Sequence, residues 1–176
     1  MNIFNQNNYF VEKTINYFRQ SRSKLLSLKT IINSRIIYKM KTSTIIKFAS
    51  FFAIISVAFG AFGAHALREK IDIRSLEVWE TATRYQFYHV FALFIIAFLK
   101  MKSDAKILNT SARFFIYGIL LFSGSLYLLA TKTLFTIDLS WAGPFTPIGG
   151  LCFIIGWILL MIFSFKMDSD LKGINS

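Results

Sequence analysis

The chain has 176 residues, of which 55% are hydrophobic and 17% aromatic, and its mean hydropathy of +0.52 excludes an ordinary soluble domain. Its 20 Lys and Arg against 9 Asp and Glu could suggest nucleic-acid binding, but the basic residues flank apolar runs, which fits lipid headgroups and topology control instead. The single cysteine, Cys152, lies inside an apolar run and excludes an intramolecular disulfide. This composition predicts a polytopic membrane protein.

Residues 1–39 differ from the rest of the chain, with seven basic residues, one acidic residue and no apolar run long enough to span a bilayer. We expect this basic N-terminal extension to be poorly ordered or partly helical. Met40 is followed by Lys41 and a long apolar stretch, which predicts a natural start at Met40 and an upstream in-frame extension before it. A basic cytoplasmic tail and an organellar transit peptide are the two alternatives.

The first apolar segment, 43–67, ends on "GAFGAHAL", where Ala64-His65-Ala66 has the form of a signal-peptidase site. We predict a retained helix, because the apolar stretch is long enough to span and small residues recur along it at four-residue spacing, as in a packing stripe. These residues are Ser56, Gly60 and Ala64.

Three further segments complete an all-α, four-helix membrane domain over 40–176, with helices at about 75–99, 111–131 and 145–166. The second reaches spanning length only if "SLEVWETATR" forms an amphipathic first part at the membrane interface. The fourth is entered through two prolines, which a first helical turn tolerates. Small residues that we expect to pack in these helices are Gly124, Gly149, Cys152 and Gly156.

Four spans place both termini on one side of the membrane, and eight basic residues on that side against five on the other predict that it is the cytoplasmic side. Trp79 and Trp141 then fall near the outer interface, where indole rings prefer to lie. The same topology gathers the polar side chains of the spans in the outer half of the bundle. They are His65, Arg84, Tyr85, Gln86, His89, Ser123, Ser125 and Thr146.

His65 and His89 come from adjacent antiparallel helices at similar depth, and ionisable groups at membrane depth suggest a functional site. Structural hydrogen bonding is the favoured interpretation, ahead of proton or ligand handling and of a metal or haem. Two histidines with no third ligand make a weak metal signal. We therefore predict no metal, no cofactor and no catalytic residue.

Four blocks of the sequence resemble one family in order: "GAFGAHAL" at 60–67, "LEVWETATRYQFYHVFAL" at 76–93, "LLFSGSLYLL" at 120–129 and "TPIGGLCFIIGW" at 146–157. They are similar to the domain of unknown function 423 family, YgdD-like small bacterial inner-membrane proteins related to the eukaryotic transmembrane protein 256. The resemblance implies a four-helix membrane protein with its first helix retained and a start close to Met40. It implies no activity.

Three functions remain open at this level. The first is a non-enzymatic accessory protein that binds a lipid or a partner subunit, or forms a homo-oligomer. The second is a minimal transporter or proton-linked carrier that uses His65 and His89, and the third is a metal- or haem-binding membrane protein. The expected location is the bacterial cytoplasmic membrane, with the mitochondrial inner membrane as the alternative.

Overall fold

The computed structural model describes residues 40–135 and 138–174, together with positions 13, 16–17, 19–22 and 24. The chain divides into two units, Met1–Lys39 and Met40–Ser176. The predicted character of the N-terminal extension falls almost wholly outside the described residues. Every element described in the second unit is helical, as the sequence predicts.

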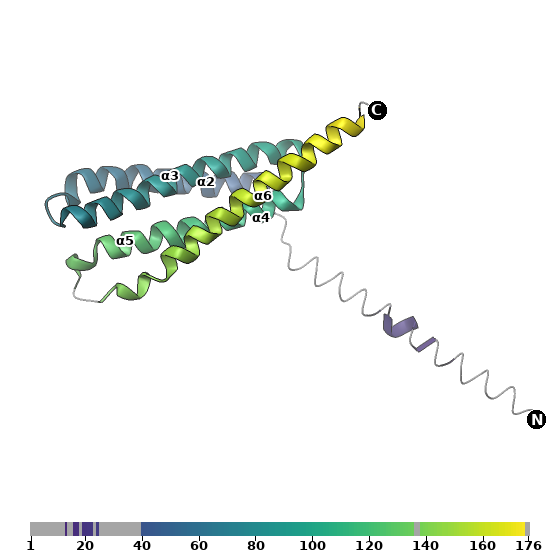
Figure 1. Ribbon diagram of the computed structural model, residues 1–176, viewed down its shortest axis with the longest axis horizontal. Coiled ribbons are helices and arrows are strands. Elements are labelled where there is room, and N and C mark those ends of the chain that lie inside the picture. Colours follow the sequence, from purple (N-terminus) through teal and green to yellow (C-terminus); the bar gives the residue numbers. More distant parts are fainter. Residues whose placement is uncertain are drawn as a thin grey trace, which may run out of the picture. The chain divides into compact units, whose positions relative to one another are not determined.

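Four helical spans form the second unit (Figure 1), and each is long and apolar enough to cross a membrane, which confirms the predicted four-helix membrane domain. Two of the spans contain a five-residue π-helical segment. In chain order the elements are α2 Thr42–Phe62 with the π segment Gly63–Leu67, α3 Ile73–Lys102, α4 Lys106–Gly118 with the π segment Ile119–Ser123, α5 Gly124–Ala130, two short 3₁₀ helices at Lys132–Leu134 and Ser140–Ala142, and α6 Phe145–Ile174.

The helices begin earlier or end later than hydropathy alone predicts. Helix α3 begins at Ile73 because Asp72 caps it: the Ser75 amide donates to Asp72 Oδ1 at 3.0 Å, and the Ser75 hydroxyl donates to Oδ2 at 2.7 Å. These bonds lower the pKa of the Asp72 carboxyl below its ordinary value. Helix α4 begins at Lys106, and α6 continues to Ile174. Apolar runs mark only the part of a helix inside the hydrocarbon, so polar end turns escape them.

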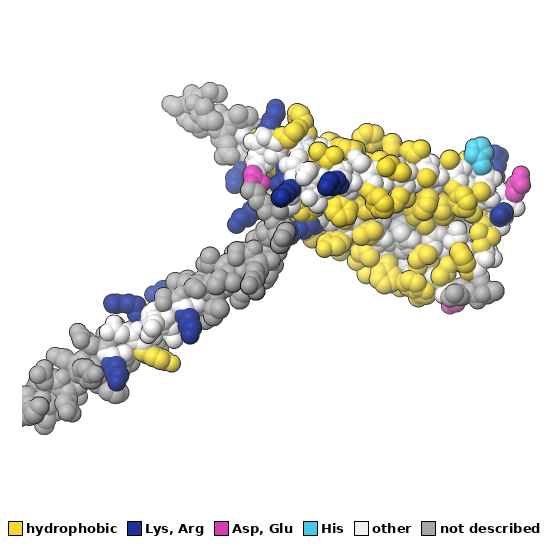
Figure 2. All heavy atoms as spheres, turned by 180° about the vertical axis from the view of Figure 1, so that it is seen from behind, with side chains coloured by type: hydrophobic (Ala, Val, Ile, Leu, Met, Phe, Trp, Pro, Cys, Tyr) yellow, Lys and Arg dark blue, Asp and Glu magenta, His cyan; other side chains and the backbone are white. Residues whose placement is uncertain are grey.

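Helix α3 and the α4–α5 span form the centre of the bundle. In each, 44% of the most apolar window is buried, against 22% in α2 and in the fourth span, so the outer helices expose most of their apolar side chains. Figure 2 shows an apolar side wall with charged groups gathered toward both ends. This wall is the surface that acyl chains cover in a bilayer.

Glycines allow the closest approaches between helices, but only some of these glycines are among the predicted packing residues. A Cβ on Gly149 would collide with the Phe122 main chain, and one on Gly156 would lie 2.8 Å from the Phe115 ring. By contrast, Gly124 faces open space and Ala64 is exposed, so neither packs in the bundle.

Two further glycines in close contacts lie outside the predicted stripes. A Cβ on Gly63 would lie 2.6 Å from the Trp79 indole, and one on Gly118 would collide with Phe153. Of the remaining predicted packing positions, Ser56 is buried, whereas Gly60 and Cys152 are half-buried. The stripe on the first span therefore continues from Gly60 to Gly63 and not to Ala64.

Candidate functional site

A polar network centred on Gln86 joins three helices in the half of the bundle that carries the α2–α3 connection. Gln86 is 2% exposed, and its Nε2 donates to the Phe52 carbonyl of α2 at 2.9 Å. The Tyr127 hydroxyl of α5 lies 3.2 Å from Gln86 Oε1 and 3.3 Å from Thr83 Oγ1. The Tyr127 hydroxyl has a single hydrogen for these two acceptors. Both acceptors belong to α3, so Tyr127 links α5 to α3 whichever of them it bonds.

An aromatic cluster lies directly beside this network. The Trp79 indole N–H donates to the Phe59 carbonyl at 2.8 Å, and the Trp79 ring centroid lies 4.6 Å from that of Tyr127. Trp79 is only 5% exposed, so its ring packs inside the bundle and does not face the surroundings. The reason is that Gly63 leaves room for the ring and α2 offers its polar atom a carbonyl. Trp141 is exposed.

His89 forms a hydrogen-bonded bridge between α3 and α6. Its Nδ1 lies 2.7 Å from the Tyr85 carbonyl, which places the hydrogen on Nδ1, because a carbonyl only accepts. Its Nε2 accepts from the Trp157 indole at 3.2 Å, and the ring stacks on Phe153 with an interplanar angle of 5°. Both ring nitrogens are occupied, so a metal or a proton reaches His89 only if one of these bonds breaks.

The structure does not bring His65 to His89. His65 lies in the π segment Gly63–Leu67 and is exposed, whereas His89 is buried, and within 40–135 and 138–167 no hydrogen bond or ring contact joins the two. Among the described residues, no group of three or more His, Cys, Asp and Glu side chains could hold a metal ion. The paired-histidine site envisaged from depth alone is therefore not assembled.

The remaining predicted residues separate into buried and lipid-facing sets. Ser125 donates to the Phe122 carbonyl at 3.0 Å and lies 2.7 Å from the Thr146 hydroxyl, which links α5 to α6. Ser123 is fully buried, and its hydroxyl has no partner among the described atoms. Tyr85 is exposed and its ring contacts Phe122, 4.8 Å away between centroids. Arg84 is also exposed.

One interhelical contact escaped the sequence reasoning. The Ser111 hydroxyl is fully buried and donates to the Gly156 carbonyl of α6 at 2.8 Å. In the sequence, Ser111 is a small hydroxyl residue near the start of an expected membrane helix, and many serines that only pack share this feature. Tyr127 lies in the block at 120–129 that resembles the family, but the sequence analysis did not predict it as a site residue.

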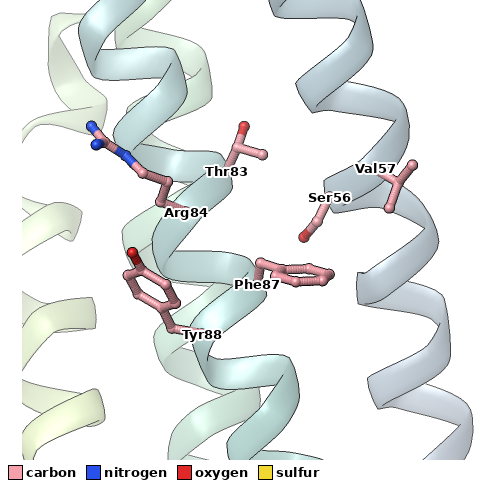
Figure 3. A pocket seen from close by; sticks show the side chains of 6 residues that line it. All are labelled: Ser56, Val57, Thr83, Arg84, Phe87 and Tyr88. Carbon is pink, nitrogen blue, oxygen red and sulfur yellow. The ribbon is translucent and has the colours of Figure 1, made fainter.

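A groove lies between α2 and α3, with a volume of about 280 Å³, and Figure 3 shows the side chains that line it. A second lateral groove of about 430 Å³ lies over Gly124, between α5 and Trp141. The first contains one charged side chain, Arg84. Its lining residues are Ser56, Val57, Thr83, Arg84, Phe87 and Tyr88.

The sequence was compared with known proteins. Residues 59–150 match the family model described as "Protein of unknown function (DUF423)". The UPF0382 membrane protein YwdK of Bacillus subtilis is 42% identical over 115 residues, 65% of this chain and 89% of the relative. A UPF0382 membrane protein of Haemophilus influenzae is 40% identical over 131 residues, 74% of this chain and 98% of the relative. No solved structure matches the chain.

Proposed function

This chain belongs to the DUF423 family of proteins of unknown function, and we propose that it is a non-enzymatic accessory protein that binds a lipid at its lateral surface. The relatives are named membrane proteins of bacteria. We place the chain accordingly in the bacterial cytoplasmic membrane, with both termini on the cytoplasmic side where basic residues are in excess.

The main support is the way in which the interior polar groups are used. Each of the main interior polar side chains forms a hydrogen bond to a different helix. They are Gln86, Tyr127, His89 and Ser125. Hydrogen bonds of this kind hold membrane helices together. The two grooves described above, in contrast, are open and lined mainly by apolar side chains, which acyl chains can contact.

The carrier and haem alternatives receive less support from this geometry. Both need His89 to exchange a partner during function, and breaking its bond to Trp157 would leave the indole N–H of a membrane-spanning helix unpaired. Neither gains a second histidine, because His65 is exposed outside the cluster.

Native mass spectrometry of the full chain, extracted in mild detergent, tests the proposal. We expect a bound lipid that survives the double substitution His65→Ala and His89→Ala, since neither residue lines a lateral groove. A chain that is free of lipid after mild extraction would contradict the proposal. An added mass that disappears with the histidines would instead favour the metal, haem or carrier alternative.

A further inference from the structure

The groove between α2 and α3 combines apolar walls with one cationic side chain. Figure 3 shows Thr83 and Phe87 directed from α3 toward α2, with Arg84 and Tyr88 along the α3 flank. Val57 forms part of the α2 wall and is 66% exposed, so its side chain packs against little of the protein. In a membrane, an acyl chain is the group that fills such an apolar furrow.

Arg84 is not neutralised by the protein. Its guanidinium donates to the Thr81 hydroxyl at 3.4 Å, and among residues 40–135 and 138–167 no carboxylate lies within ion-pair distance of it. Glu80, one turn earlier on the same helix, does not pair with it. A guanidinium inside a membrane span needs an anion or water, so the exposed Arg84 guanidinium is available to a ligand of negative charge.

The position of Arg84 along α3 fits the phosphate level of a bilayer. Arg84 precedes Lys102, at the end of α3, by eighteen residues, which is about 27 Å of helix at 1.5 Å per residue. The hydrocarbon core is about 30 Å thick. With Lys102 at one boundary, Arg84 lies within one turn of the other, and Figure 3 shows its side chain directed back toward the start of α3.

Ser56 lines the groove, and its hydroxyl has no hydrogen-bond partner among the described atoms. A serine in a membrane helix commonly bonds back to the carbonyl four residues earlier, which here is Phe52. Gln86 donates to that carbonyl, and the Ser56 hydroxyl has no partner although the residue is only 2% exposed. Figure 3 shows the Ser56 side chain directed from α2 toward α3.

We propose that this groove binds one anionic glycerophospholipid, with the phosphate on Arg84 and an acyl chain along Val57 and Phe87. Guanidinium and phosphate form paired, charge-assisted hydrogen bonds, which select a lipid over an uncharged partner helix. Ser56 lines the same groove and carries a buried hydroxyl without a partner among the described atoms. The inference rests on the proposed lipid-binding function and assigns it a site and a lipid class.

The test uses the full chain in vesicles of equal phosphatidylglycerol and phosphatidylcholine, followed by mild extraction and native mass spectrometry. We expect wild type to retain phosphatidylglycerol preferentially. Arg84→Gln should lower that preference about tenfold, because one charge-assisted contact is lost. The matched control Arg74→Gln removes the same charge from an exposed position of the same helix outside the groove and should keep the preference.

A second pair of variants tests the groove by its shape. Val57→Trp fills the groove and should abolish retention, whereas Ile54→Trp, at an equally exposed position outside it, should not. Wild-type retention in both Arg84→Gln and Val57→Trp would overturn the site while leaving the lipid-binding function intact. A lipid-free wild type would refute the function itself. If wild type is a dimer and Val57→Trp dissociates it, the groove binds a second copy of the chain, and the proposed lipid site is wrong.

Discussion

Replacing Gln86 by leucine tests whether the network that joins α2, α3 and α5 holds the bundle together. The substitution removes the bond to the Phe52 carbonyl and the bond from Tyr127. Interhelical hydrogen bonds in membrane proteins contribute about 0.6 kcal/mol on average and at most about 1.7 kcal/mol. Two lost bonds therefore predict that the free energy of unfolding falls by about 1–3 kcal/mol.

The assay is reversible unfolding in mixed micelles, followed by tryptophan fluorescence, because Trp79 lies 4.6 Å from Tyr127 between ring centroids. A double-mutant cycle with Tyr127→Phe isolates the bond between the two side chains, and we expect a coupling of about 0.6 kcal/mol. Ser164→Ala, which removes an exposed hydroxyl bonded within its own helix, is the control. Unchanged stability in Gln86→Leu, or a coupling indistinguishable from zero, would refute the reasoning.

Three further predictions concern packing, the histidine bridge and pH. Gly149→Ala should destabilise the protein by about 1–3 kcal/mol through a main-chain clash, whereas Gly124→Ala, which faces open space, should be neutral or stabilising; thermal unfolding of the pair distinguishes them. Trp157→Phe should cost about 1 kcal/mol by leaving a His89 nitrogen unpaired, and equal stability to wild type in the same micelle assay would contradict the bridge. Because the folded-state pKa of Asp72 is lowered, its stabilising effect should be complete above its ordinary pKa and be lost as the pH falls through the lowered value. Asp72→Asn should therefore flatten the acid limb of a plot of stability against pH, and an unchanged limb would exclude this capping effect.

Part of the candidate site could be read from the sequence because depth in a membrane follows from residue number along a spanning helix. That reasoning grouped Gln86, Ser125 and Thr146 in one half of the bundle, and the structure places them in interhelical contacts there. Depth gives no information on direction around the helix axis. The depth of the histidines was also misjudged: α3 begins at Ile73, so His89 lies sixteen residues into α3, whereas His65 lies in the π segment that precedes it.

The sequence by itself determined the number of spans, their approximate limits and the membrane class, because the hydrocarbon core requires long apolar helices whatever their neighbours are. Only the tertiary structure decided which small residues pack. Gly63 meets Trp79 while the adjacent Ala64 is exposed, since successive residues point in different directions around a helix. Partners such as Gln86 and the Phe52 carbonyl come from separate helices, and their contact depends on how those helices rotate and approach one another.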